Sequence, residues 1–372
     1  MGAVETYSPF ISPQKLREFI INKKKVMIEV KKEGILLKKT SLGFECEGVL
    51  NPAVISENGI IHLFYRAVAK GNYSSIGYCK LSSPLVVESR NDVPIIFPQC
   101  AYETHGVEDP RITKIEEIYY LTYTCFDGVN ALGALLFSED LINWHKMGVI
   151  VPQIPYDEFF RLAFAKGTLN EKYVRYNDPS HLLEREGKKI LIWDKNVIFF
   201  PRRIDGKLFF LHRVKPDIQL VSINHLNELT TEFWQHYFLH LHHNIVLTPK
   251  HEHEVSYIGG GCPPIETEHG WLLIYNGVHD TLKGYVYSAC AALLDLENPL
   301  KELARLPYAL FTPEEEWELT GEVNNVCFPT GTTLVDDRLY IYYGAADEQI
   351  AVASLSLSAL LNELMLYTKN DE

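Results

Sequence analysis

A unit of three consecutive apolar strands recurs five times along the chain and limits the folds that it can adopt. In each copy a first strand containing a proline is followed by a short polar turn, an aromatic second strand and a third strand. The copies begin near residues 48, 107, 196, 257 and 325. Repeats of short antiparallel strands at this spacing are typical of β-propellers, in which each copy forms one blade around a central channel. We therefore predict an all-β, five-bladed β-propeller, although the fourth strand of each blade is not resolved by the pattern.

The repeat accounts for most of the 372 residues, so we predict a single catalytic domain over residues 1–372. An N-terminal arm (1–45) precedes the first copy, and its lysine-rich segment 23–39 alternates like an exposed strand. Two inserts (151–195 and 227–254) interrupt the repeat, the second with a partly helical pattern, and a closing helix is expected at about 357–366. A β-sandwich is the alternative fold. The first strands should line the channel and bring together at one end the positions around Pro52, Pro110, Pro201, Pro263 and Pro329.

Composition narrows the range of partners. The net charge of −13 disfavours nucleic acid and anionic membrane surfaces. Seven cysteines without a paired motif indicate reduced thiols. No stretch approaches the roughly 18 apolar residues of a transmembrane helix, and the N-terminus lacks the apolar core of a signal peptide. These features predict a cytoplasmic protein and are compatible with a homo-oligomer.

The string GVEDPR, residues 106–111, is the first candidate for chemistry. Asp109 and Glu108 are paired acids beside Pro110, and a proline favours an extended conformation in the residue before it. We therefore expect Asp109 on a fixed backbone at the mouth of a strand, next to aromatic residues, where a general acid could act. The alternative is a solvated turn with an incidental salt bridge to Arg111.

Motifs for cofactors or metals are missing. The chain has no phosphate-binding glycine loop, no dinucleotide fingerprint and no GxSxG elbow. The histidines of the second insert fit no standard zinc spacing, and HEHE is not HExxH; they are His240, His242, His243, His251 and His253. We therefore expect no metal and no cofactor. Carboxylates, arginines and aromatic residues remain, which suit a small carbohydrate substrate, and two carboxylates suffice for glycoside cleavage.

Several strings together resemble glycoside hydrolase family 130. They are GVEDPRI, FFPRRIDGK, IGGGCPPIET, GWLLIYNGV, GYVYSACAALLDLENP, NVCFPTGTTL and LYIYYGAAD, in this order over roughly residues 45–355. The resemblance implies a five-bladed propeller that acts on β-mannosides, either as a phosphorylase or as a hydrolase. It also implies that Asp109 is the general acid, protonating the leaving oxygen through a sugar hydroxyl. Three further residues match positions that hold the mannosyl unit, namely Asn51, Arg66 and Asp347.

Phosphorylases of this family hold phosphate with four basic residues. Lys195 and Arg213 keep a positive charge at two of these positions, whereas Tyr257 and Asn276 stand at the others. Tyrosine and asparagine can still contact the substrate, but they carry no charge to offset the desolvation of a phosphate dianion. This departure favours water as the nucleophile.

A water nucleophile needs a general base across the sugar ring from the acid. Glu254 and Glu322 are the candidates, with a solvent-facing rim position as the alternative for each. The leading interpretation is an inverting glycoside hydrolase that cleaves short β-linked manno-oligosaccharides. The first alternative is a β-mannoside phosphorylase that uses inorganic phosphate as co-substrate and releases mannose 1-phosphate. The second is a non-catalytic sugar-binding propeller.

Overall fold

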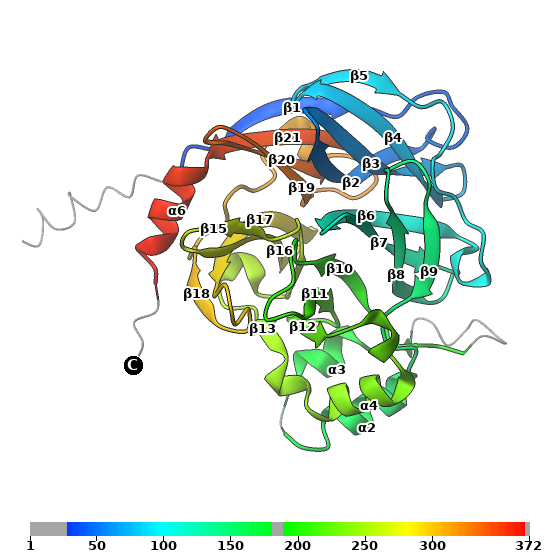
Figure 1. Ribbon diagram of the computed structural model, residues 1–372, viewed down its shortest axis with the longest axis vertical. Helices are drawn as coiled ribbons and strands as arrows, with labels where there is room; N and C mark the ends of the chain where they lie inside the picture. The colour runs from blue at the N-terminus through cyan, green and yellow to red at the C-terminus, as the bar shows by residue number, and fades with distance from the viewer. Residues whose placement is uncertain (1–27, 168, 181–188, 369–372) are drawn as a thin grey trace, which may run out of the picture.

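A computed structural model describes residues 28–167, 169–180 and 189–368, and these residues form mainly antiparallel β-sheets (Figure 1). Each sequence copy supplies three consecutive strands, as predicted. The first two copies are β2 (Gly48–Glu57), β3 (Ile60–Ala69) and β4 (Tyr73–Ser83), then β6 (Gly106–Ile115), β7 (Ile118–Phe126) and β8 (Ala131–Ser138). The third is β10 (Lys195–Phe199), β11 (Leu208–Arg213) and β12 (Ile218–Ile223). The last two are β14 (Tyr257–Gly260), β16 (Gly270–Thr281) and β17 (Gly284–Leu294), then β19 (Cys327–Val335), β20 (Arg338–Ala345) and β21 (Gln349–Ser356).

Each copy also has a fourth, outer strand. The sequence pattern missed four of these five, whereas the fifth, from the N-terminal arm, falls within the segment 23–39 that was expected to be an exposed strand. These strands are β5 (Val86–Arg90), β9 (His145–Val149), β13 (Ile245–Leu247), β18 (Glu302–Arg305) and β1 (Lys31–Leu37), and a short β15 (Ile265–Thr267) also pairs with β16. Most of them are short, and β5 and β9 are largely exposed, so apolar alternation is weak. The fourth strand of the last copy comes from the N-terminal arm, because β1 pairs antiparallel with β21. In Figure 1 the units lie around a common centre, with β2, β6, β10 and β19 facing it.

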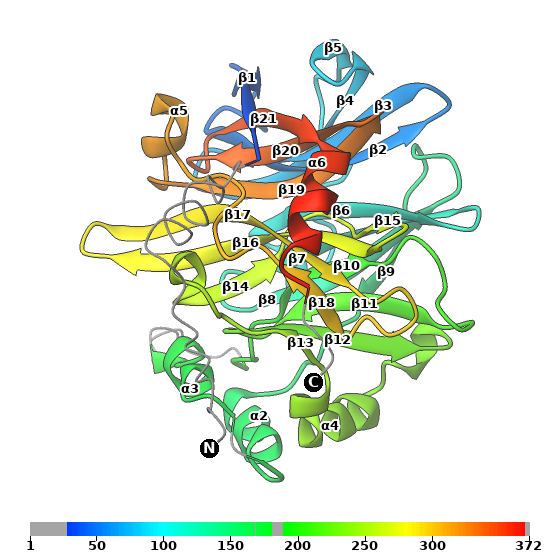
Figure 2. The same cartoon turned by 90° about the vertical axis from the view of Figure 1, so that its left-hand side faces the viewer.

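Helices occupy the two inserts and the C-terminal end. Figure 2 shows α2 (Tyr156–Ala163), α3 (Lys172–Tyr176) and α4 (Thr231–Leu239) together at one end of the molecule. The second insert is therefore partly helical, as predicted. The predicted closing helix is α6 (Leu357–Met365), which begins where the Ser356 side chain accepts a hydrogen bond from the Ala359 backbone amide. The remaining helical pieces are α5 (Glu316–Leu319) and the 3₁₀ turns η1 (Ala101–Glu103), η3 (Leu226–Glu228), η4 (Leu241–His243) and η5 (Glu252–Glu254). In the N-terminal arm the segment SPQKLREFI (12–20) favours a short helix with Ser12 as its cap, and this segment lies outside the described residues.

A buried acid, tyrosine and cation recur in four of the five units. The acid precedes the first strand, the tyrosine lies on the second strand and the cation lies on the outer strand. The sets are Glu45, Tyr65 and Arg90; Glu103, Tyr123 and Lys146; Glu254, Tyr275 and Arg305; and Glu318, Tyr343 and Lys32. Each carboxylate is fully buried, and each accepts a hydrogen bond from the tyrosine hydroxyl and pairs with the cation. A buried charge needs such partners. In these four units the network therefore links the segment before the first strand to the second strand and to the outer strand.

Asp109 has a left-handed backbone, which corrects its expected extended conformation before Pro110, and Asn51 before Pro52 has the same backbone conformation. Their φ angles are both 49°, a region that asparagine and aspartate tolerate better than most residues. The cause is a β-bulge in each strand, since the pairing of β2 with β3 and of β6 with β7 skips two residues there. A third bulge in β10 contains Asn196, with φ of 57° and no proline. Pro201 and Pro263 follow their strands rather than lying in them, and β14 pairs with β16 without a bulge, so neither the proline nor the bulge recurs in all five first strands.

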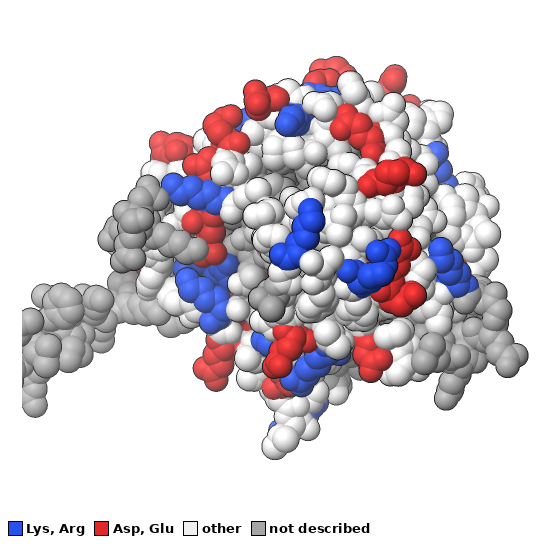
Figure 3. All heavy atoms as spheres, turned by 90° about the horizontal axis from the view of Figure 1, so that it is seen from below, with Lys and Arg blue, Asp and Glu red and all other residues white. Residues whose placement is uncertain are grey.

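Figure 3 views the end that carries α2 and α4, where acidic and basic side chains are interspersed. Among the described residues, no helix combines the length and apolar character needed to cross a membrane. All seven cysteines are free thiols, as the sequence indicated.

Candidate functional site

The first strands border a central cavity of about 250 Å³. It contains seven of the residues selected from the sequence, namely Asn51, Arg66, Asp109, Lys195, Arg213, Tyr257 and Asp347. It also contains residues that the sequence analysis did not single out, namely Trp193, Asn196, Lys215, Tyr287, Val323, Val326 and Phe328. The cavity has an acidic side and a basic side, with aromatic rings along its wall.

On the acidic side, Arg66 links the first two units. Its guanidinium lies 3.0 Å from Glu108 and 3.4 Å from Asp109, and its Nε donates to Ser74 Oγ at 2.9 Å. Asn51 Nδ2 donates to Asp109 Oδ1 at 2.8 Å, so the two left-handed bulges direct their side chains at each other. This approach requires a glycine at position 344, because a Cβ there would lie 2.1 Å from Asn51 Oδ1.

On this side of the cavity, the pKa values of the two aspartates are shifted in opposite directions. Burial would raise the pKa of Asp109, but Arg66 and the Asn51 amide outweigh it and hold the pKa below its usual value. Asp347, which follows β20, behaves in the opposite way. Burial, together with Asp109, Glu108 and Glu322, raises the pKa of Asp347 to about 6, against the opposing effect of Arg66. Near pH 6 Asp347 is therefore about half protonated, whereas Asp109 is ionised.

On the basic side, Lys195 and Arg213 are cross-strand partners on β10 and β11. Burial and the neighbouring cations Arg213 and Arg66 lower the pKa of Lys195, although Glu108 and Asp109 oppose them. Lys215, two residues beyond β11, brings a third cation to the cavity. Its ammonium lies 4.1 Å from the centroid of the Tyr257 ring, and the Arg213 guanidinium lies 5.7 Å from the same centroid. Like charges this close repel, so the arrangement suits an anionic ligand.

Behind the basic side, a series of buried, hydrogen-bonded side chains holds strands β10 and β11 in place. His212 Nδ1 lies 2.7 Å from Asp194 Oδ2, and its Nε2 lies 2.8 Å from the hydroxyl of Tyr237 on α4. Asp194 precedes Lys195, and His212 precedes Arg213. The second insert therefore supplies α4, which braces the backbone that carries the cations.

Three predicted residues lie away from this cavity. Glu322 is exposed and lines a neighbouring cavity of about 450 Å³, which shares Arg66 and Asp347 with the central one. Asn276 is buried on β16 beside β14, where its Nδ2 donates to Gly260 O at 3.2 Å. Glu254 is fully buried as the acid of the repeated triad and accepts from Tyr275, from Arg305 at 3.1 Å and from two backbone amides. The expectation that Glu254 faces the sugar as a base is therefore wrong, because its oxygens are already engaged.

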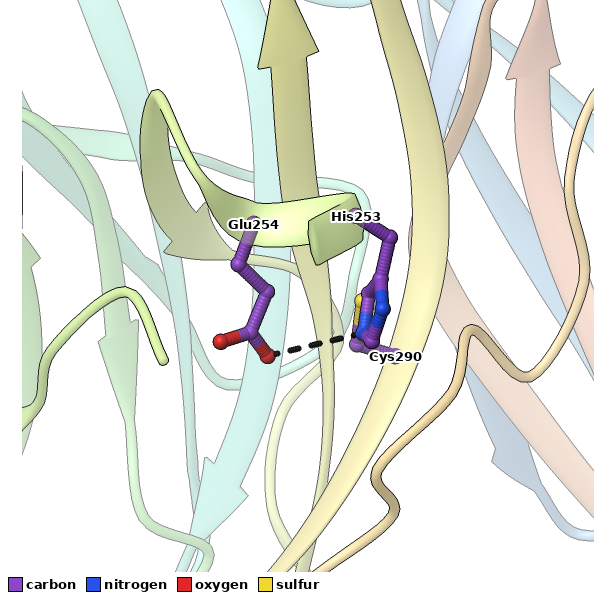
Figure 4. A group of neighbouring side chains, drawn as sticks. All are labelled: His253, Glu254 and Cys290. Carbon is purple, nitrogen blue, oxygen red and sulfur yellow. Dashed lines mark ion pairs between the residues drawn. The ribbon is translucent and has the colours of Figure 1, made fainter. Parts of the chain in front are cut away.

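Figure 4 shows the side chains of His253, Glu254 and Cys290, whose ligand-type atoms lie within 4.8 Å of one another. The dashed line joins His253 Nε2 to Glu254 Oε1 at 3.7 Å. The Glu254 carboxylate belongs to Arg305 and Tyr275, and burial raises the pKa of the Cys290 thiol, whereas metal binding requires a thiolate. We therefore interpret this group as part of the triad network and assign no metal to it.

The sequence contained a signal for one of the missed cavity residues. Lys215 stands two positions after Arg213 in the string LHRVKP, but only the arginine matched a known position. Trp193, Tyr287 and Phe328 are aromatic residues on or beside strands, and their pattern is the same as that of core residues. Only their places around the cavity distinguish them.

An antiparallel β fold with paired acids, clustered cations and aromatic walls around one cavity defines the site of a carbohydrate-active enzyme. The family model Glyco_hydro_130, described as beta-1,4-mannooligosaccharide phosphorylase, matches residues 37–173 and 157–366. The chain belongs to this family, glycoside hydrolase family 130, and is an enzyme of the glycosidase or glycoside phosphorylase type.

Two relatives that align with most of the chain are named as phosphorylases. The chain is 32% identical over 347 residues to a 1,2-beta-oligomannan phosphorylase of Thermoanaerobacter sp. (strain X514), covering 89% of this chain and 98% of the relative. It is 34% identical over 327 residues to a beta-1,2-mannobiose phosphorylase of the same organism, covering 83% and 90%. The solved beta-1,2-mannobiose phosphorylase of Listeria innocua aligns with a TM-score of 0.69 at 22% identity, over 91% of this chain and all of that one, and this supports the fold.

Proposed function

We propose that this enzyme is a β-mannoside phosphorylase, with short β-1,2-linked manno-oligosaccharides as substrates and α-mannose 1-phosphate as a product. The observation that carries the proposal is the convergence of Lys195 and Arg213 on the cavity that also holds Asp109. The names of the relatives that align over most of the chain support both phosphorolysis and the β-1,2 linkage. This reverses the preference for hydrolysis drawn from Tyr257 and Asn276, because the cavity contains more positive charge than those two positions suggested.

In the proposed reaction each side of the cavity has its own role. Asn51, Arg66 and Asp347 hold the mannosyl unit, and Lys195 and Arg213 hold phosphate. A phosphate oxygen attacks the anomeric carbon on the face opposite the leaving oxygen, and the glycosidic bond breaks. The leaving oxygen receives a proton that originates from Asp109 and passes through a sugar hydroxyl. One displacement inverts the anomeric centre, so a β-mannoside yields an α-phosphate.

The low pKa of Asp109 leaves it ionised in the free enzyme, whereas a general acid must carry a proton. Burial is the largest influence on this pKa, and it acts upward. When the sugar displaces water from the cavity, that influence grows and the effect of solvent on the carboxylate is lost. Protonation of Asp109 therefore accompanies substrate binding.

The cavity depends on the way in which the five units meet. We infer that they close as a five-bladed propeller, with β1 completing the last unit and the bulges of β2, β6 and β10 facing the channel. This architecture explains how residues from all five sequence copies reach one cavity of about 250 Å³. A homo-oligomer remains a prediction.

The test is to supply β-1,2-, β-1,3- and β-1,4-mannobiose with and without phosphate and to follow mannose and mannose 1-phosphate. We expect α-mannose 1-phosphate from the β-1,2 substrate only when phosphate is present, with the anomer assigned by NMR. The reverse reaction should release phosphate from α-mannose 1-phosphate and mannose. Asp109→Asn is the control for contaminating activity. Free mannose at a rate independent of phosphate would overturn the proposal in favour of the hydrolase.

A further inference from the structure

Three cations face the central cavity without a carboxylate to neutralise each of them. Among the described residues, no ion pair within 4.0 Å joins Lys195, Arg213 or Lys215 to an acid. The Arg213 Nε is buried and has no hydrogen-bond partner there. Keeping such groups charged in a partly buried site is costly unless an anion binds them.

Lys215 is placed to join the other two cations. It lies in the connection between β11 and β12, and its ammonium rests 4.1 Å from the centroid of the Tyr257 ring. Lys195 and Arg213 are close enough to depress the ionisation of Lys215, so the three charges share one region of the cavity. A lysine head held over an aromatic face keeps its remaining donors free for a ligand.

We propose that Lys215 is a third phosphate-binding residue, which completes an anion subsite with Lys195 and Arg213. This inference rests on the proposed phosphorolysis and adds a residue that the sequence motifs did not identify. Tyr257, on β14, carries no charge at this point of the cavity. Lys215, from the neighbouring unit, brings a positive charge to the same place. The Tyr257 ring acts as the surface on which the lysine side chain lies.

The same geometry makes phosphate affinity dependent on pH. Burial, with Arg213 and Lys195, lowers the pKa of Lys215 to about 7. A bound dianion favours the charged lysine, so anion binding takes up a proton and weakens as the pH rises above about 7. The groups that face Lys215 are Arg213 from β11, Lys195 from β10 and Tyr257 from β14. Tyr257 stays neutral because burial raises its pKa, whereas the lowered pKa of Lys195 means that it can contribute to the same trend.

The experiment compares wild type with Lys215→Gln, Lys215→Arg and the control Lys207→Gln, an exposed lysine in the turn before β11. Loss of one charge-assisted hydrogen bond should raise the phosphate KM about 10- to 100-fold in Lys215→Gln. The mannoside KM should change less than about threefold, and Lys207→Gln should match wild type. An unchanged phosphate KM in an active Lys215→Gln, or an equal rise in the mannoside KM, would overturn the proposal.

Sulfate is the probe for the pH dependence, because it stays a dianion between pH 6 and 9, whereas phosphate itself titrates. Its inhibition constant against phosphate should rise above pH 7 in wild type and stay much flatter in Lys215→Arg, which remains charged. Equal pH profiles in the two proteins would refute the role of Lys215. If wild type forms no mannose 1-phosphate, the proposed function fails. In that case calorimetric binding of sulfate to wild type and Lys215→Gln still decides whether Lys215 completes an anion subsite.

Discussion

Replacement of Asp347 by asparagine should stabilise the ligand-free enzyme at neutral pH. The pKa of Asp347 rises from 3.8 to about 6 on folding, a difference of about 2 units. Each unit corresponds to about 1.4 kcal/mol, so ionised Asp347 costs the folded state at most about 3 kcal/mol. The side chain is only partly buried and the cavity admits water, so we expect a gain of about 1–2 kcal/mol in Asp347→Asn.

The sign of this effect follows from the pH range. Below pH 3.8 the carboxyl is protonated in both the folded and the unfolded chain, and it does not distinguish them. Between about pH 4 and 6 the unfolded chain ionises first, so the wild type loses stability as the pH rises. Above pH 6 the full cost applies. Asparagine avoids this cost, and the stability difference between variant and wild type should grow from pH 4 to pH 7.5.

The assay is urea denaturation of both proteins at pH 4.5, 6 and 7.5, with the free energy of unfolding compared at each pH. Glu117→Gln, at a side chain that is 94% exposed, controls for the loss of one negative charge. The variant should also lose activity, because Asp347 lines the cavity. A stability difference that is independent of pH, or a variant less stable than wild type at pH 7.5, would refute the electrostatic reasoning.

Two further predictions separate catalytic from structural acids. Asp109→Asn should lower kcat about 10²- to 10⁴-fold, the usual share of general acid–base catalysis, and near-normal turnover of a mannobiose would remove Asp109 from its role. Glu254→Gln should instead lower the free energy of unfolding by about 2–4 kcal/mol while kcat stays within threefold, because its partners Arg305 and Tyr275 are structural. A large loss of kcat at unchanged stability would restore Glu254 as a candidate base.

The sequence predicted the three inner strands of every unit because alternation of apolar and aromatic residues reports burial directly. It did not predict β5, β9, β13 and β18, because strands of three to five residues are too short to show such alternation. It also could not predict the left-handed backbone of Asp109, because the rule for residues before proline describes regular chains and not a bulge. Local rules fail where pairing with a neighbouring strand decides the conformation.

The candidate site shows the same division between local and long-range information. Asn51, Arg66 and Asp347 were found because strings of neighbouring residues identify them, and the cavity brings them together. Lys215 was missed because its role depends on the Tyr257 ring, which lies 42 positions later in the chain. Glu254 was misjudged because its partners follow 21 and 51 positions later. Its equivalents at the start of other units, such as Glu103, were the available signal.

The pairing of β1 with β21 has a consequence for synthesis of the protein. The ribosome delivers β1 among the first described residues, yet its partner strand emerges more than 300 residues later. Lys32 on β1 is also the cation that neutralises the buried Glu318, so the last unit is electrostatically incomplete until both ends of the chain meet. The earlier units can form during translation, whereas this one must wait until β21 has been synthesised. A nascent chain stalled before residue 349 therefore exposes the edge of β20 that β21 would otherwise cover, and it leaves β1 without its partner strand.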